Sequence, residues 1–476
     1  MDITDYSARG IFQNAGLSSE PQRKSVDVGK LEAKVNRVSI SGVSRIRPGV
    51  LNTLSHRIIM AKTVEDVARE AREVAGKLQA LGIAKEAFVV MDQARSEEGQ
   101  KESSGLLVDV GLECVEGKWF SLRTEAGVED NEGTAGVTGR LLNIFGGGES
   151  ADVQYARGSK TQAAFHAGFA MPVAASPDST FNVSGMQRMV SCRPYSEHDE
   201  THRELLLGYK TTDPLHTSVH DLAYSLTWRN ICNLGTRASP TLRTEAGHSL
   251  KSSLWHTLAL DTRDSARVPT HGSLLKLSTE FAGLIDGLGD TRFVKTRAEF
   301  QTNQDLGSGF TVSTGLQGGL LWNLDPARKR SRLADRFFLG GSTSVRGFEY
   351  HGIGPRDGND SIGGDAFYAA GISLLTPLPF VKTDMLKGHV WANAGQLALL
   401  DSRGLLRKGG QRDSGHASAR REIHRFLMSP SAAVGVGLVY NHSIVRAELS
   451  LCFPITATPT DRPKVGPQFG LGLVFL

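Results

Sequence analysis

From Trp119 to the C-terminus, apolar and polar residues alternate with a period of two. Phe120, Leu122 and Thr124 alternate with polar or charged neighbours, and the same pattern recurs around Leu449. Successive side chains of a β-strand point to opposite faces, so the pattern predicts strands with one apolar and one polar face.

The alternating region divides into sixteen candidate strands. Each strand with its connection takes about 22 residues, as expected for tilted membrane-spanning strands of about 9–11 residues joined by turns. We therefore predict a transmembrane β-barrel of sixteen antiparallel strands over residues 118–476. The expected strands begin near residues 119, 134, 151, 162, 180, 203, 218, 250, 272, 292, 310, 366, 387, 432, 443 and 467.

Two connections are much longer than the others, residues 323–365 and 399–430. They follow the eleventh and thirteenth candidate strands, so both lie on the side of the barrel away from the N-terminal residues. Long loops on one side and shorter turns on the other are typical of such barrels.

Residues 30–117 show mixed periodicity, which predicts one small α/β domain. Thr63 and Asp66 match a capping box at the start of an amphipathic helix. Residues 1–29 are polar and aperiodic, and we expect a flexible tail there. The expected order is a strand over 34–42, a helix from Pro48, a helix from Thr63 to Gly82, and strands over 87–93 and 106–115.

Composition narrows the range of functions. The net charge is only +4 with Lys and Arg scattered along the chain, so nothing predicts nucleic-acid binding. No apolar run of about 18 residues occurs, but a barrel needs none because only alternate residues face lipid. The 4 cysteines are far apart and show neither metal-ligand nor disulfide spacing. The N-terminus shows no basic segment followed by an apolar one, so we expect no secretory signal.

The long connection 323–365 contains the motif Val345-Arg346-Gly347-Phe348. Loops of this length in ordered proteins are uncommon and usually functional. The motif resembles the Val/Ile-Arg-Gly-Phe/Tyr signature of the outer-membrane β-barrel assembly superfamily. In that superfamily the signature lies between strands eleven and twelve, and the resemblance implies that the loop folds back inside the barrel.

Two further features strengthen this resemblance. The β-α-α-β-β order of residues 30–117 resembles a single polypeptide-transport-associated (POTRA) domain. Gln468, Gly470, Leu473 and Phe475 match the polar-x-Gly-x-x-hydrophobic-x-hydrophobic signal of mitochondrial barrel precursors. With one POTRA-like domain and no secretory signal, the chain resembles the central barrel subunits of mitochondrial sorting and assembly machineries.

The resemblance implies a protein of the mitochondrial outer membrane, with its N-terminal domain in the intermembrane space, that inserts and folds β-barrel precursors. Its implied partners are the precursors, bound through their C-terminal signal, the peripheral cytosol-facing subunits of the same machinery, and the lipid bilayer. It implies no cofactor, and no metal is expected. A bacterial-type protein-translocating or solute pore of the same superfamily is the alternative, and a soluble multi-stranded binding protein is the third.

The implied mechanism uses a lateral seam between the first and last strands. An unpaired strand edge can add an incoming strand by β-augmentation. The seam residues expected from the sequence are Phe120, Leu122, Thr124, Gln468, Gly470, Leu473 and Phe475. Gly470 weakens side-chain packing in the last strand, which fits either a labile seam or relief of crowding inside the barrel.

Arg346 needs an acceptor inside the barrel, because a buried charge without a partner is costly. Relatives often carry Asp-x-Gly in strand thirteen, whereas this chain has Asn393 at the matching place. Asp365, Glu448 and Asn393 remain as candidate acceptors, and the sequence does not choose between them.

Other motifs do not support catalysis. Residues His198 to His202 resemble a zinc-protease motif, but the glutamate is one position late, no helix is expected, and we predict a polar hairpin loop. Gly146 to Gly148 reads as a turn between strands, because no helix follows to complete a phosphate site. No serine lies in a Gly-x-Ser-x-Gly elbow, so we do not predict an enzyme.

Overall fold

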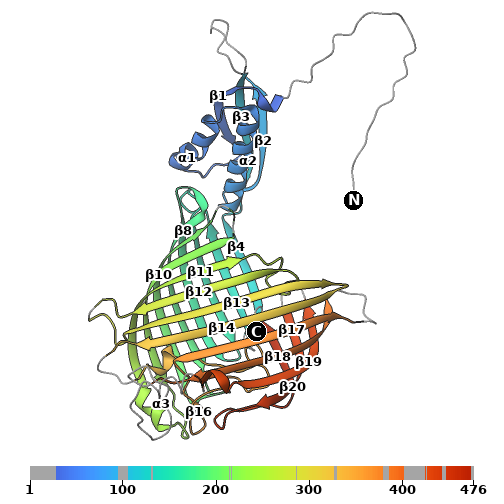
Figure 1. Ribbon diagram of the computed structural model, residues 1–476. Coiled ribbons are helices and arrows are strands. Elements are labelled where there is room, and N and C mark those ends of the chain that lie inside the picture. Colours follow the sequence, from blue (N-terminus) through green and yellow to red (C-terminus); the bar gives the residue numbers. More distant parts are fainter. Residues whose placement is uncertain are drawn as a thin grey trace, which may run out of the picture.

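The structure of the chain is a computed structural model. It describes residues 28–94, 106–129, 132–213, 215, 217–285, 287–325, 330–378, 385–400, 424, 426–441 and 446–472. Most of the N-terminal tail, most of the connection 399–430, Leu473 and Phe475 lie outside the described residues. Figure 1 shows a small α/β domain at one end of a large curved sheet.

The α/β domain has the predicted order of elements. After a short 3-10 helix (η1, Val28–Lys30) it comprises β1 (Ala33–Ser41), α1 (Pro48–Ile59), α2 (Val64–Ala80), β2 (Ala84–Gln93) and β3 (Leu106–Glu116). β3 is the central strand, parallel to β1 and antiparallel to β2. Helix α2 packs Val67, Val74 and Leu78 into the domain core. No helix in the described part of the chain is long and apolar enough to cross a membrane.

The cap of α2 shows why this helix begins at Val64. The Thr63 hydroxyl accepts from the backbone N–H of Asp66 (3.1 Å) and donates to the Asp66 carboxylate (2.8 Å). An N-cap of this kind satisfies a backbone N–H that has no partner inside the helix. The predicted capping pair is therefore in contact at the first turn.

The sixteen predicted strands are confirmed as one antiparallel sheet, and each of them pairs with its sequence neighbours. They are β4 (Phe120–Glu129), β5 (Glu132–Leu142), β6 (Ser150–Gly158), β7 (Thr161–Val173), β8 (Ser176–Ser191), β9 (Asp199–Thr212), β10 (Ser218–Cys232), β11 (Gly247–Asp261), β12 (Gly272–Ala282), β13 (Phe293–Gly307), β14 (Phe310–Asn323), β17 (Ala366–Pro377), β18 (Leu386–Ala398), β19 (Ser431–Asn441), β20 (Arg446–Thr456) and β21 (Gly466–Gly472). A short helix, α3 (Pro240–Glu245), lies between β10 and β11.

The two faces of the sheet differ as the alternation predicts. Leu122 and Val153 are both 64% exposed on the outer face. On the inner face, opposite charges meet across the β12–β13 ladder, where Glu280 pairs with Lys295. Lys251 of β11 adds an ion pair to Glu280 at 2.7 Å. The sheet therefore presents an apolar outer wall and a charged lumen, as a membrane barrel requires.

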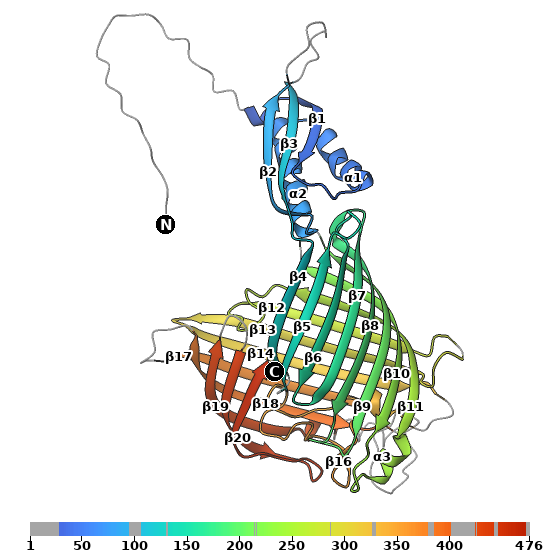
Figure 2. The same cartoon turned by 180° about the vertical axis from the view of Figure 1, so that it is seen from behind.

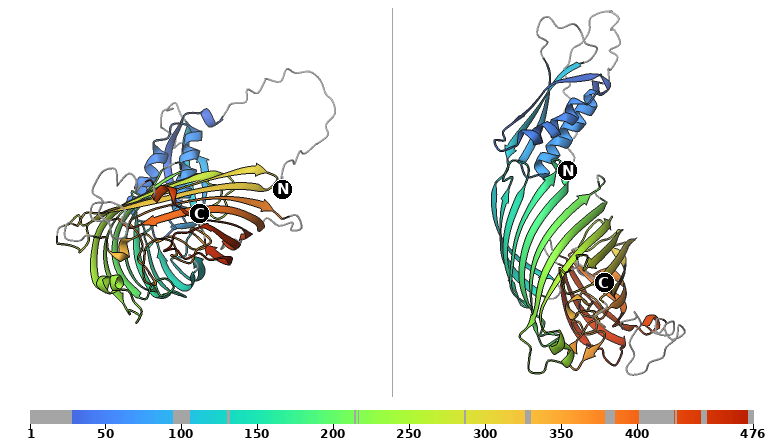
Figure 3. Two further views of the ribbon diagram at one scale, coloured as in Figure 1. Left: turned by 60° about the horizontal axis from the view of Figure 1, so that its bottom comes forward. Right: turned by 90° about the vertical axis from the view of Figure 1, so that its left-hand side faces the viewer.

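The sheet curls round until its two ends approach each other (Figures 2 and 3). The end strands are β4 and β21, and no ladder joins them in the described residues. Their Cα atoms nevertheless come within 8 Å. Among the described residues, the first and last strands thus lie beside each other without pairing.

The α/β domain contacts the turn between β5 and β6. The backbone N–H of Arg47 donates to Gly146 O (2.8 Å), and the Arg47 side chain forms an ion pair with Glu149, which is 1% exposed. Residues 146–148 form bends in this turn, with no helix after them. We call this end of the barrel the near end and the opposite one the far end.

Candidate functional site: the loop inside the barrel

The segment between β14 and β17 starts at the far end and runs into the barrel. It contains a 3-10 helix, η2 (Leu333–Asp335), and two short strands, β15 (Arg356–Asp357) and β16 (Asp360–Ser361). Its motif residues are buried, with Val345 and Phe348 at 0% exposed and Arg346 at 1%. Val345 and Phe348 pack in one hydrophobic cluster with residues of the barrel wall, namely Trp391, Ala433 and Cys452.

Arg346 binds Glu448 on the inner face of β20. Its Nη2 and Nε atoms donate to Glu448 Oε2 at 2.8 and 3.2 Å. The guanidinium carbon also lies 5.4 Å from the ring centroid of Trp391 on β18, within the range of a cation–π contact. Glu448 is 2% exposed, so the ion pair is shielded from water.

A second arginine shares the same carboxylate. Arg446 donates to Glu448 Oε1 and, through its other terminal nitrogen, to the backbone carbonyl of Arg267 (3.0 Å). Arg267 lies in the turn between β11 and β12, which comes from the near end. The Glu448 carboxylate therefore joins the inward loop to the barrel wall, and Arg446 extends the network to this turn.

The tip of the loop is also held by the last strand. Gln468 of β21 accepts from the backbone N–H of Gly347 (3.0 Å) and donates to the carbonyl of Phe348 (2.9 Å). The N–H of Lys464 donates to the carbonyl of Gly347 (2.8 Å). Because three polar contacts converge on two residues, the tip is fastened to β21 and to the segment just before it.

Only glycine fits at position 347. Its φ is +83°, and an added Cβ would lie 2.6 Å from the Cβ of Ala433. A side chain there would meet both an unfavourable backbone conformation and the wall of β19. The motif therefore combines a charged anchor, a glycine that allows close approach, and two apolar residues that fill the contact.

The three candidate acceptors of Arg346 have different positions. Glu448 is bonded to Arg346, whereas Asp365, just before β17, accepts from Ser331 and from the N–H of Leu400 (3.1 Å). Asn393 of β18 is 4% exposed, and its amide atoms have no hydrogen-bond partner among the described residues. The sequence did not reveal the role of Arg446, although it lies two positions before Glu448 and so on the same face.

The expected seam residues divide between the two faces of the sheet. Phe120 and Leu122 of β4 are exposed on the outer face, and Thr124 is exposed as well. Gln468 and Gly470 of β21 are buried, while Phe469 between them is 51% exposed. The structure therefore brings Gln468 to the loop motif and leaves the β4 residues on the outer wall.

The expectation of a polar loop at residues 198–202 was wrong. His198 is 1% exposed and closes a tight turn, with Glu200 and His202 already in β9. The backbone hydrogen bond between Cys192 and His198 closes this short turn, and the loop between β14 and β17 packs against it. Alternation of apolar and polar residues does not reveal such a contact.

The arrangement holds the inward loop in place. Its polar groups are guanidinium, carboxylate and amide groups that bind one another across the lumen. Fixing an inward loop to the last two strands couples the loop to one edge of the sheet. That coupling is the physical property of the site.

Comparisons with known proteins agree with this geometry. A family model described as the Omp85 superfamily domain matches residues 143–475. The chain is 32% identical over 462 residues to a sorting and assembly machinery component 50 homolog of Xenopus tropicalis, covering 96% of this chain and 94% of that protein. The human homolog of the same name is 31% identical, with 96% and 93% covered.

A solved structure has a similar fold. BamA of Haemophilus ducreyi lacking POTRA domains 1–3 superposes with a TM-score of 0.71 at 15% identity, covering 92% of this chain and 84% of that one.

Proposed function

The chain belongs to the Omp85 superfamily, among the sorting and assembly machinery component 50 proteins, and from this premise we propose that it inserts and folds β-barrel precursors in an outer membrane. We place it in the mitochondrial outer membrane, with the α/β domain in the intermembrane space. The precursors are its clients, and the far-end loops face the cytosol and its peripheral partner subunits. The lipid bilayer surrounds the apolar wall, and no catalytic step is involved.

One observation carries the mechanism: β4 and β21 are the two ends of the sheet, and no ladder joins them in the part of the chain that the structure describes. In lipid, an unsatisfied backbone N–H or C=O group costs several kcal/mol. An incoming client strand that pairs with one of these edges removes that cost by β-augmentation. The seam therefore acts as the template on which a client barrel grows.

The inward loop keeps the template in shape. Arg346 and Gly347 hold β20 and β21 through Glu448 and Gln468. A fastened β21 stays in register with β20 while its other edge accepts a client strand. Phe348 and Val345 are fully buried in the lumen, which disfavours the alternative of a wide solute pore.

The test compares membranes with and without the chain. Outer-membrane vesicles depleted of the protein receive a radiolabelled barrel precursor, and a parallel sample receives the purified chain as well. We expect a protease-resistant folded precursor only where the chain is present. The matched control is the same precursor without its last strand, which should not be inserted.

The pore alternative makes the opposite forecast. A pore conducts ions steadily in a planar bilayer and shows no dependence on the precursor's last strand. Insertion that proceeds equally in depleted vesicles, or steady conductance with no insertion, would refute the proposed function.

A further inference from the structure

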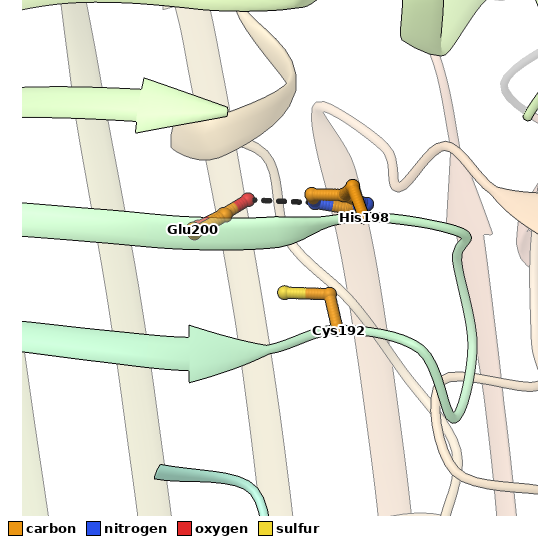
Figure 4. A group of neighbouring side chains, drawn as sticks. All are labelled: Cys192, His198 and Glu200. Carbon is orange, nitrogen blue, oxygen red and sulfur yellow. Dashed lines mark hydrogen bonds and ion pairs between the residues drawn. The ribbon is translucent and has the colours of Figure 1, made fainter. Parts of the chain in front are cut away.

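The turn between β8 and β9 brings three metal-binding side chains together. Cys192 follows the last residue of β8, His198 precedes the first residue of β9, and Glu200 lies within β9. The N–H of Cys192 donates to the carbonyl of His198 (3.0 Å), which closes the turn. One thiol sulfur, one imidazole nitrogen and one carboxylate oxygen lie within 4.8 Å of one another (Figure 4).

This cluster is buried and already ordered. Cys192 is 3% and His198 1% exposed, and His198 Nε2 lies 3.0 Å from Glu200 Oε1. The other oxygen of Glu200 lies 2.9 Å from His202 Nε2. Carboxylates that bind metals are commonly oriented by such an outer hydrogen bond. Among the described residues, His198 Nδ1 has no hydrogen-bond partner although it is buried.

We propose that Cys192, His198 and Glu200 bind one Zn²⁺ ion. Thiolate, imidazole and carboxylate bind Zn²⁺ at about 2.3, 2.0–2.1 and 2.0–2.2 Å, so tetrahedral ligand atoms lie roughly 3.4–3.6 Å apart. His198 Nε2 and Glu200 Oε1 are 3.0 Å apart, and all three ligand atoms lie within 4.8 Å of one another. Small side-chain movements are enough to bring these separations to the tetrahedral values. Three protein ligands leave the fourth position to water, with His202 as the outer partner of Glu200.

The protonation of the thiol defines the binding step. Zinc binds cysteine as the thiolate, so binding forms the Zn–S bond and releases the thiol proton to solvent. Cys192 is only 3% exposed, and redox-reactive cysteines are accessible to solvent, which disfavours a redox-reactive cysteine as the alternative.

The metal would stabilise the far-end anchor of the inward loop. The ring of Tyr195, in the same turn, lies 4.3 Å from the ring of His351. The carbonyl of Tyr195 accepts from the N–H of Ser361 (3.0 Å), and Asp360 accepts from the N–H of Glu197 (2.8 Å). The loop is thus held at the far end by this turn and deep in the barrel by Glu448. The zinc site needs no client protein, so it stands independently of the proposed function.

The test measures metal binding by the full-length chain in detergent. Protein stripped with a chelator is titrated with Zn²⁺ by equilibrium dialysis and with Co²⁺ by absorption spectroscopy. We expect one ion per chain and a near-ultraviolet thiolate-to-cobalt charge-transfer band. Cys192→Ser should abolish the band and weaken binding more than about 100-fold, since loss of an outer partner alone costs 10–100-fold. His202→Gln should keep the band and weaken zinc binding by only about 10–100-fold.

Controls distinguish this site from the other residues that could bind metal. Cys232→Ser changes a cysteine outside the cluster and should leave binding and the band unchanged. On the outer wall, His220 Nδ1 lies 3.2 Å from His256 Nε2. His220→Gln therefore tests whether the metal binds at this histidine pair instead. His198→Gln provides a second ligand variant if Cys192→Ser does not fold by circular dichroism. The proposal is overturned if folded ligand variants bind as well as the native chain, or if only His220→Gln loses binding.

Discussion

Replacing Glu448 by Gln tests the buried charges that fix the inward loop. In the native protein one carboxylate serves Arg346 and Arg446, and Glu448→Gln leaves both cations without it. Breaking a buried ion pair by removing one partner costs about 3–5 kcal/mol. Because about 1.4 kcal/mol is a factor of ten, the docked loop should lose two to nearly four orders of magnitude in population relative to the released loop.

Arg346→Ala should cost less, because Glu448 keeps its ion pair with Arg446. The assay is amide hydrogen exchange at Gly347 and Lys464, whose N–H groups are bonded only while the tip is docked. We expect exchange to quicken in Arg346→Ala and to quicken further in Glu448→Gln. Arg57→Ala is the control, since this exposed arginine of α1 forms its ion pair with Glu73 (3.2 Å) in the α/β domain. Equal exchange in all variants, or faster exchange in Arg346→Ala than in Glu448→Gln, would refute the reasoning.

The other predictions concern one glycine and the α/β domain. Gly347→Ala should release the loop tip, because the added Cβ would lie 2.6 Å from the Cβ of Ala433. Amide exchange at Lys464 should then be faster than in the native protein, and unchanged exchange would contradict this prediction. Thr63→Ala should lower the stability of α2 by about 1 kcal/mol, measured by exchange at Asp66, whereas Thr63→Ser should retain most of it. Hydrogen bonds from Ser44 and then Arg45 hold the pKa of Glu116 below its ordinary 4.5. The stability that this adds is complete above pH 4.5 and is lost as pH falls through the lower, folded-state pKa; Glu116→Gln should flatten that pH dependence, and an unchanged slope would contradict the assignment.

Period-two alternation was sufficient to locate the strands. Every expected strand start lies within four residues of the observed one, from Phe120 of β4 to Gly466 of β21. The reason is physical: a barrel wall between lipid and a charged lumen must alternate along each strand. Thr63 marked the start of α2 in the same local way, through its cap.

Contacts between distant segments could not be predicted from such patterns. Glu448 lies 102 positions after Arg346, and the depth to which a loop enters a barrel leaves no periodic signal. Alternation placed Glu448 on the inner face but could not choose it over Asp365. Cys192 and His198 meet only because a tight turn closes between β8 and β9, and their spacing matches no metal motif.

The central claim is that the sheet parts between β4 and β21 to admit a client. The most direct measurement locks this seam with a disulfide between one cysteine placed at Phe120 to Arg123 and one at Gln468 to Gly470, choosing the pair that oxidises completely. A control disulfide joins Leu277 and Ala298, which are paired in the β12–β13 ladder. We predict that the locked seam stops insertion of a barrel precursor, that a reductant restores it, and that the control lock has no effect. Full insertion through the oxidised seam would contradict the account.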